Sequence, residues 1–207
     1  MKKYLVEFIG TFFLVLAIGM NVIDPGAGNL APVAIGLALM VMVYAGGHVS
    51  GAHYNPAVTI AVWLRGRCAA ADVAPYIVCQ LLGSAAASFA VLHFKGHGGT
   101  PQELNTVNAL AAELIGTFCL VYVILNVATA KATAGNSFYG LAIGLTVTAM
   151  AFVFGGISGG VFNPAVAVGA TLMHLESAAN IWIYLVANVA AGAIAALTFK
   201  LIHPEDK

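Results

Sequence analysis

Asn55-Pro56-Ala57 and Asn163-Pro164-Ala165 are two copies of one triplet, and they lie 108 residues apart (163 − 55). The same offset relates two further pairs: Ala34-Ile35-Gly36-Leu37 with Ala142-Ile143-Gly144-Leu145, and Ser50-Gly51 with Ser158-Gly159. One triplet can arise by chance, but three pairs in one register indicate a single domain, 1–207, built from two repeats of about 1–100 and 101–207. Internal duplication in an apolar chain is typical of membrane channels and transporters.

The composition identifies lipid as the solvent of this chain. Of its 207 residues, 61% are hydrophobic and 8% are charged, and the mean hydropathy is +0.95. A soluble domain carries about 25% charged residues, so we expect the lipid bilayer to surround the protein. The net charge of zero gives no reason to expect nucleic acid as a partner. Cys68, Cys79 and Cys119 lack the spacing of metal ligands, and we expect neither a metal nor another cofactor.

Six segments are long and apolar enough to cross a bilayer, which takes about 20 residues of helix for roughly 30 Å of hydrocarbon. They are predicted at about 4–23, 30–48, 71–93, 108–129, 137–155 and 178–202. With the N-terminus inside, the cytoplasmic side receives seven of the eight Lys and Arg residues: Lys2, Lys3, Arg65, Arg67, Lys131, Lys200 and Lys207. Only Lys95 lies outside. This bias predicts a multi-pass protein of the cell membrane with both termini in the cytoplasm.

Two further apolar stretches, Pro56–Leu64 and Pro164 to about Met173, are too short to span. At 1.5 Å per residue each gives about 14–15 Å of helix, or half a bilayer. Each follows a glycine-rich stretch, 46–51 or 155–160, and irregular backbone at membrane depth is tolerated only inside protein or along a water-filled cavity. Each repeat has three full spans, an odd number, so the second repeat must be inverted. The predicted fold is an all-α membrane protein with six transmembrane helices and two re-entrant half-helices that meet near the midplane.

The meeting point of the half-helices has a chemistry of its own. Asn is a favoured N-cap and Pro suits the first helical position, which explains each triplet alone but not their convergence. Two facing helix N-termini place about half a positive charge each at one depth. A cation or hydronium ion meets a barrier there, while a neutral hydrogen-bonding molecule does not. We expect the amides of Asn55 and Asn163 to donate to the permeant and the loop carbonyls to accept from it.

Glu7 and Glu113 are the only acidic residues well inside the predicted spans, at an offset of 106 (113 − 7). A buried carboxylate is costly unless it is paired or hydrogen-bonded. A proton relay would make the protein a coupled transporter, whereas hydrogen bonds to the re-entrant backbone would make each Glu a brace for its loop. We favour the brace, because no buried Lys, Arg or Asp is available to complete a relay.

The paired triplets, the Ser-Gly stretch before each and the segments Glu7-Phe8-Ile9-Gly10-Thr11 and Glu113-Leu114-Ile115-Gly116-Thr117 resemble the aquaporin, or major intrinsic protein, family. The resemblance covers essentially the whole chain. It implies a bundle of six tilted helices in which the two half-helices form a seventh pseudo-span. It also implies a homotetramer with one pore in each protomer, and a protein that is not an enzyme. No Ser/His, paired Asp or zinc-ligand arrangement suggests catalysis either.

The resemblance places the narrowest part of the pore at four positions, counted from the two Asn residues: Ile35, Ala151, Gly160 and Val166. Water-selective members of the family resemble one another in having an aromatic residue, a His, a small residue and an Arg there. This chain has no aromatic residue, His or Arg at these positions. Val166 also repeats Val58, which follows the first triplet, and this repetition alone would be ordinary packing. We expect a wider, less polar constriction without a fixed positive charge.

Two histidines are candidates for lining the pore, His48 and His53, both in the glycine-rich stretch or directly after it. A pH gate is one interpretation. A structural, hydrogen-bonded histidine is the interpretation that we favour.

The sequence therefore predicts a passive channel for small uncharged solutes: water and larger neutral molecules such as glycerol, urea, ammonia or undissociated metalloid acids. Protons and ions would be excluded at the two triplets. A water-selective aquaporin is the first alternative. A proton-coupled secondary transporter, which would also have inverted repeats, is the alternative of another class, with Glu7 and Glu113 as its candidate titrating groups.

Overall fold

The computed structural model describes residues 1–206, and this part of the chain contains helices and no strand. Lys207, counted above among the cytoplasmic charges, lies outside the described residues. Six long helices confirm the six predicted spans, with ends that differ by a few residues: α1 (Lys2–Val22), α2 (Ala31–Ser50), α4 (Ala70–Lys95), α5 (Thr106–Ile124), α6 (Tyr139–Ser158) and α8 (Ile181–Ile202). Short helical segments extend or join them: η1 (Gly28–Leu30), η2 (Leu125–Thr129), η3 (Lys131–Thr133) and η4 (Ala178–Asn180).

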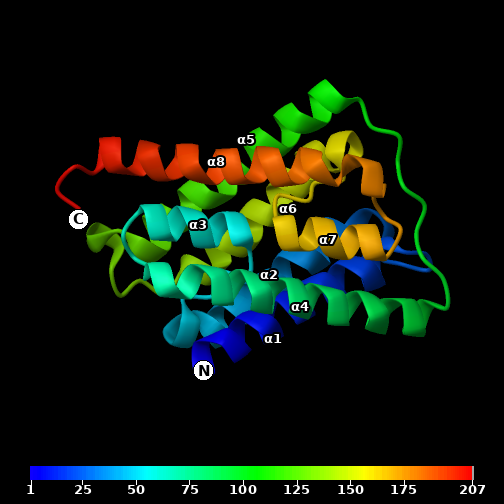
Figure 1. The fold of residues 1–207 in the computed structure, drawn as a ribbon, viewed down its shortest axis with the longest axis horizontal. Helices are drawn as coiled ribbons and strands as arrows, with labels where there is room; N and C mark the ends of the chain where they lie inside the picture. Colours follow the sequence, from blue (N-terminus) through cyan, green and yellow to red (C-terminus); the bar gives the residue numbers. More distant parts are fainter. Residues whose placement is uncertain (207) are drawn as a thin grey trace.

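The two half-helices are α3 (Pro56–Leu64) and α7 (Pro164–Leu172), each nine residues long. Pro occupies the first helical position of both, where its missing N–H costs no hydrogen bond. They lie one after the other along the long axis of the molecule, within the cage of long helices (Figure 1). The all-helical architecture with two half-length helices is thus confirmed.

The glycine-rich stretches are more helical than the sequence suggested. Helix α2 continues through Gly46 and Gly47 to Ser50, and α6 continues through Gly155 and Gly156 to Ser158. Each helix ends at the next glycine, whose backbone is left-handed: Gly51 has φ 87° and Gly159 has φ 86°. Glycine takes this conformation without a steric penalty. The irregular entry to each half-helix is therefore short, 51–55 or 159–163, and His48 lies on α2 rather than in a loop.

The half-helices interlock the two repeats. Helix α3 packs against α8 and α4, and α7 packs against α4 and α8, so each contacts the last long helix of both repeats. Ser84 of α4 donates to the carbonyl oxygen of Ala165 at 2.6 Å. At the corresponding place in the other repeat (192 − 84 = 108), a β-carbon on Gly192 of α8 would come within 2.8 Å of the carbonyl oxygen of Ala57. Small residues at both crossings let the long helices approach the start of each half-helix.

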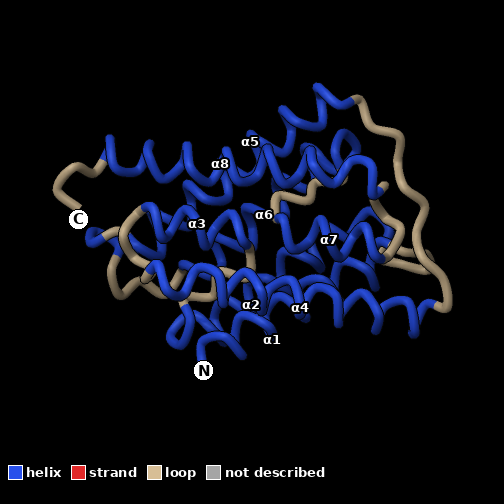
Figure 2. The backbone as a smooth tube through the Cα atoms, in the orientation of Figure 1, coloured by secondary structure: helices blue, strands red, loops and turns tan. Residues whose placement is uncertain are grey.

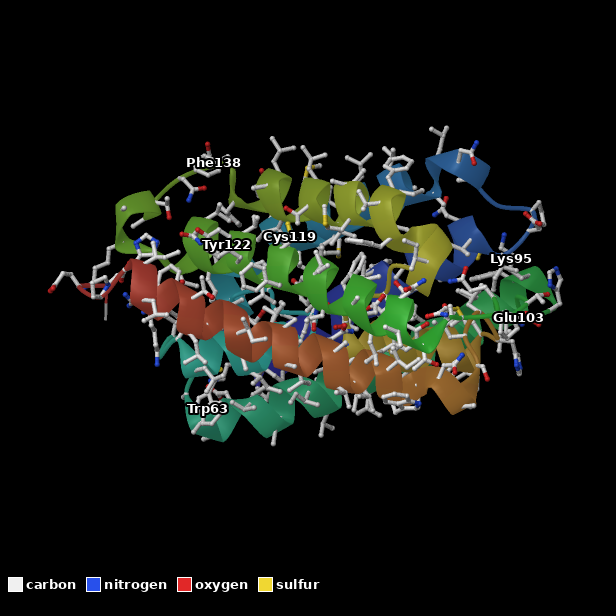
Figure 3. The ribbon with its side chains drawn as sticks, turned by 90° about the horizontal axis from the view of Figure 1, so that it is seen from above. Trp63, Lys95, Glu103, Cys119, Tyr122 and Phe138 are labelled. Atoms are coloured by element: carbon white, nitrogen blue, oxygen red, sulfur yellow. The ribbon has the colours of Figure 1, made fainter. Side chains whose placement is uncertain are left out.

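One end of the molecule is covered by the connection between α4 and α5, the long loop of 96–105 (Figure 2). The backbone N–H of Gly99 donates to the carbonyl oxygen of Met173 at 2.9 Å, which docks this loop on the turn after α7. Both chain termini lie toward the opposite end (Figure 1). Viewed with side chains, Lys95 and Glu103 mark the loop end and Phe138 the other end (Figure 3).

Candidate functional site

A cavity of about 320 Å³ extends between the long helices and past both Asn-Pro-Ala triplets. Much of its wall is apolar, with Leu14 and Ile18 from α1, Leu39 from α2 and Ile143 and Val147 from α6. Six residues of the wall have polar side chains that are not phenolic: His53, Asn55, Thr100, Gln102, Asn163 and Glu176. An apolar passage with a few polar groups provides little binding energy, as expected for a conducting pore.

Asn55 and Asn163 cap the two half-helices in the same way. The Oδ1 atom of Asn55 accepts from the backbone N–H groups of Ala57 at 2.9 Å and Val58 at 3.4 Å. The Oδ1 atom of Asn163 accepts from the equivalent groups of α7, again at 2.9 and 3.4 Å. Both caps leave the amide nitrogen free to bond elsewhere.

The amide nitrogens bond across the pseudo-symmetry between the repeats. The Nδ2 atom of Asn55 donates to the carbonyl oxygen of Phe162, and that of Asn163 donates to the carbonyl oxygen of Tyr54, both at 2.9 Å. An amide nitrogen carries two hydrogens, so each Asn keeps one N–H that these bonds do not use. Both side chains line the cavity. Each therefore holds a donor in a fixed orientation at the cavity wall.

The two re-entrant loops share an unusual backbone. Ala52 and Gly160, related by the offset of 108 (160 − 52), have φ 53° and 65°, and Tyr54 and Phe162 have φ 50° and 49°. The left-handed conformation costs a non-glycine residue roughly 1–2 kcal/mol. Such loops persist only when surrounding groups hold them in place.

Glu7 supplies this restraint in the first repeat. It is fully buried, and its Oε1 atom accepts from Ser50 Oγ at 2.6 Å and from the backbone N–H of His53 at 3.0 Å. Its Oε2 atom accepts from the backbone N–H of Tyr54 at 2.7 Å and from Gln80 Nε2 at 2.8 Å. Four donors thus saturate the carboxyl group.

Glu113 makes the equivalent bonds in the second repeat. Its Oε1 atom accepts from Ser158 Oγ at 2.7 Å and from the backbone N–H of Val161 at 2.9 Å. Its Oε2 atom accepts from the backbone N–H of Phe162 at 2.7 Å. Neither Glu113 nor Glu7 belongs to the cavity wall. This geometry fits a brace and gives a permeating proton no direct access to either carboxyl group.

The four positions of the expected constriction, Ile35, Ala151, Gly160 and Val166, all line the same cavity as the two Asn residues. Gly160 lies close to α6, since a β-carbon on it would stand 3.4 Å from the Cα atoms of Ala151 and Gly155. One turn of helix beyond Ala151, Gly155 lines the cavity as well and has open space where a side chain would project. This side of the passage is therefore formed largely by backbone.

His53 is buried and lies between the cavity and a network of polar groups. Thr59 Oγ1 donates to the carbonyl oxygen of Asn55 at 3.0 Å, which uses its single hydrogen. His53 Nδ1 lies 3.1 Å from Thr59 Oγ1 and must then be the donor of that pair, which leaves Nε2 as an acceptor in the neutral ring. His48 is exposed in the last turn of α2 and lines a second, larger hollow, which adjoins the cavity at His53 and lies toward the end of the molecule where the termini lie.

Three of the six polar residues of the cavity wall were not among the predicted site residues: Thr100, Gln102 and Glu176. Glu176 follows α7 and is 5% exposed, and burial raises the pKa of its carboxyl group to about 7, a rise that the neighbouring hydroxyl of Tyr184 reduces in part. A signal was present in the sequence, because a lone Glu stands a few residues after the second half-helix, in a chain with few charges. It lay outside the predicted spans and was therefore not considered.

Comparison with known proteins agrees with this architecture. The family model of the major intrinsic proteins matches residues 1–199. Aquaporin NIP1-1 of Zea mays is 39% identical over 217 residues, which cover 100% of this chain and 76% of the relative. Glycerol uptake facilitator protein-like 6 of Lactiplantibacillus plantarum is 36% identical over 217 residues, with 100% of both chains covered.

A solved structure shares the fold. The X-ray structure of the aquaglyceroporin from Plasmodium falciparum matches with a TM-score of 0.83 at 22% identity, over 98% of this chain and 97% of that one. At this identity the likeness speaks for the fold alone. The sequence matches carry the assignment further, and they confirm the resemblance that the paired triplets indicated. The chain belongs to the major intrinsic protein family, a family of multi-pass membrane channels for small solutes.

Proposed function

We propose that this protein is a passive channel for small uncharged solutes and that its pore admits molecules larger than water, such as glycerol, urea, ammonia or undissociated metalloid acids. One observation carries the proposal. The cavity wall that holds Asn55 and Asn163 has Ile35, Ala151, Gly160 and Val166 at the expected constriction, and none of these four side chains carries a charge or a hydrogen-bonding group. Width, rather than a fixed cation, would then limit passage.

Exclusion of protons and ions is proposed for the region of the two triplets. Helices α3 and α7 begin there with opposed N-termini, each equivalent to about half a positive charge. Asn55 and Asn163 each use one N–H of the side-chain amide in the bond to the other repeat. The group that each still offers to the cavity is the second N–H. A permeating molecule would accept from both, and a water molecule with both lone pairs engaged cannot pass a proton along a hydrogen-bonded chain.

The names of two relatives support the solute class. One relative is named a glycerol uptake facilitator-like protein and another an aquaporin. Glycerol and water permeation are therefore both reasonable for this chain, and the constriction favours the wider range.

We further propose a homotetramer in the cell membrane with cytoplasmic termini. The long helices expose many large apolar side chains, among them Leu5, Phe13, Phe89, Phe152, Val186 and Leu197, which suit contact with lipid or with another protomer. The bias of Lys and Arg residues supports the orientation, and it puts the 96–105 loop outside.

The proposal is tested by stopped-flow light scattering on proteoliposomes, with sucrose, glycerol and urea gradients. Wild-type vesicles should shrink in each gradient and then re-swell quickly in glycerol and urea. Val166→Arg should suppress this re-swelling and keep water flux, because it narrows the passage and adds a fixed charge. Fast water flux without entry of either solute into wild-type vesicles would replace the proposal with a water-selective pore.

A further inference from the structure

The outer half of the cavity contains a buried carboxyl group with an unused oxygen. Glu176 lies in the turn between α7 and η4 and packs against the backbone of Gly159, the residue directly before Gly160 of the expected constriction. The side chain lines the cavity and is 5% exposed. Within residues 1–206, its Oε2 atom is buried and has no hydrogen-bond partner. The fold thus leaves one oxygen of a carboxyl group in the cavity wall without a partner.

A buried donor that also lacks a hydrogen-bond partner lies on the 96–105 loop, which covers this end of the molecule. Gln102 also lines the cavity, and its Nε2 atom is buried without a hydrogen-bond partner in the described part of the chain. The contact between Gly99 and Met173 holds the loop against the turn that leads to Glu176. Two chain segments that are far apart in sequence therefore bring an acceptor and a donor to one cavity.

The turn itself does not need a carboxyl group. In the first repeat the position equivalent to Glu176 is Cys68 (176 − 68 = 108), which follows α3 as Glu176 follows α7. Cys68 does not line the cavity. The carboxyl group is thus a feature of the outer half alone, whereas the braces Glu7 and Glu113 occur in both repeats. A buried polar group that the repeated fold does not require points to a role with the permeating molecule.

We propose that Glu176 and Gln102 form a solute-binding subsite in the outer half of the pore. The subsite takes neutral molecules that carry both N–H or O–H donors and an oxygen acceptor, the class of small amides and polyols. The donors of the solute bond Glu176, and its oxygen accepts from Gln102. This inference rests on the proposed function, since only a pore that admits solutes larger than water has a use for such a site.

The physical reason is the cost of dehydration. A polyol or amide loses hydrogen bonds to water when it enters a passage with an apolar constriction, and a polar group that is left unpaired is expensive. Ile35, Ala151 and Val166 offer no replacement from their side chains. Glu176 and Gln102 replace two of the lost bonds just before the constriction, which lowers the barrier for these solutes more than for a small water molecule.

The test compares urea, glycerol and water permeability in proteoliposomes of the full-length channel. Glu176→Leu keeps a similar volume and removes the acceptor, and Gln102→Leu removes the donor. Each should lower the urea-to-water and glycerol-to-water permeability ratios by about fivefold, the effect of one net hydrogen bond. Glu176→Gln, which retains an acceptor oxygen, should keep both ratios within about twofold of wild type. Excess glycerol should slow urea flux through wild type and not through Glu176→Leu.

Glu103→Gln is the matched control. Glu103 is an exposed carboxylate of the same loop, at the same end of the molecule (Figure 3), and lies outside the cavity wall. Its neutralisation should leave all ratios unchanged.

Unchanged ratios in Glu176→Leu and Gln102→Leu, or an equal loss for all three permeants, would overturn the subsite while wild type still admits urea and glycerol. If Glu176→Leu does not assemble, Gln102→Leu decides, because its side chain lies on a loop outside the long helices. Failure of wild type to admit either solute would contradict the proposed function itself, and the subsite with it.

Discussion

The side-chain amide of Asn55 donates to the main-chain carbonyl of Phe162 at 2.9 Å, so the cap of one half-helix holds the loop that leads into the other. The reverse bond, from Asn163 to Tyr54, has the same length. The two repeats are therefore fastened to each other at the point where their half-helices meet. Because each amide is bonded on both its oxygen and its nitrogen, the remaining N–H of each Asn has one orientation only.

Asn55→Asp should weaken the contact between the two repeats and also the exclusion of protons. The carboxylate can still cap α3, but it faces the carbonyl oxygen of Phe162 without a hydrogen, which costs about 1–3 kcal/mol. It also puts a negative charge where two helix N-termini oppose cations. We expect a higher proton flux, measured with a pH-sensitive dye inside proteoliposomes. Asn163→Asp should behave alike, and a wild-type proton flux in both variants would contradict the electrostatic barrier.

Gly155→Leu should narrow the pore without disturbing the fold. A side chain at Gly155 meets open space beside the expected constriction. Glycerol flux should fall by roughly tenfold, which requires only about 1.4 kcal/mol of added barrier, and water flux should fall less. Gly156→Leu is the control, because Gly156 also has open space but does not line the cavity. Equal glycerol flux in the two variants would place the constriction elsewhere.

Gly116→Ala should destabilise the protein through the second loop. A β-carbon on Gly116 of α5 would overlap the ring of Phe162, which stands next to the cap Asn163. Overpacking of this kind costs about 1–3 kcal/mol. A lower thermal unfolding temperature in detergent, with Gly156→Ala unchanged, is the expected result. If the two variants melt together, the ring of Phe162 has more freedom than its burial indicates.

Glu7→Gln and Glu113→Gln should both destabilise the protein. An amide nitrogen cannot accept, so each variant loses one of the two oxygens that accept from its loop. At position 7 the nitrogen can take the place of Oε1, where the Ser50 hydroxyl can turn to accept from it and the N–H of His53 is left unpaired. At position 113 the nitrogen can take the place of Oε2, where only the N–H of Phe162 is lost. Each unsatisfied donor costs about 1–3 kcal/mol. Thermal unfolding of both variants measures the loss, and wild-type unfolding temperatures in both would refute the bracing account.

The stability of the protein should depend on the ionisation of Glu176. Burial raises the pKa of this carboxyl group from its ordinary value of 4.5 to about 7, and Tyr184 and Glu113 are the ionisable groups that interact with it. Between these two values the folded protein binds a proton that the unfolded chain has released. Stability therefore falls as the pH rises through this window and stays lower above it.

Glu176→Gln removes this dependence and gives the measurement. At about pH 5 wild type and variant should unfold at similar temperatures, and at about pH 8 the variant should unfold higher by about 2–4 °C, the shift that corresponds to 1 kcal/mol in a chain of this size. Glu103→Gln should follow wild type at both pH values. Parallel curves for wild type and Glu176→Gln would show that this carboxyl group does not titrate in the window.

The sequence by itself determined the repeats, the spans and the half-helices. These features are local or periodic: apolar length marks a span, and Asn followed by Pro marks a helix start wherever it occurs. The register between Asn55 and Asn163 then required the inverted arrangement, because each repeat has an odd number of spans. The extent of α2 and α6 was underestimated, since the glycine-rich stretches 46–51 and 155–160 were interpreted as irregular backbone, although tertiary packing overrides the low helix propensity of glycine.

Only the tertiary structure decided which groups meet inside the pore. Ser50 and Ser158 were recognised as repeated residues, but their bonds to Glu7 and Glu113 depend on how α1 and α5 pack against the loops. Glu176 and Gln102 lie in connections of no regular pattern, and the way in which the 96–105 loop folds back places both at one cavity. Local propensity fixes where a helix begins, but the position of a loop side chain depends on contacts between distant segments, which no periodicity in the sequence encodes.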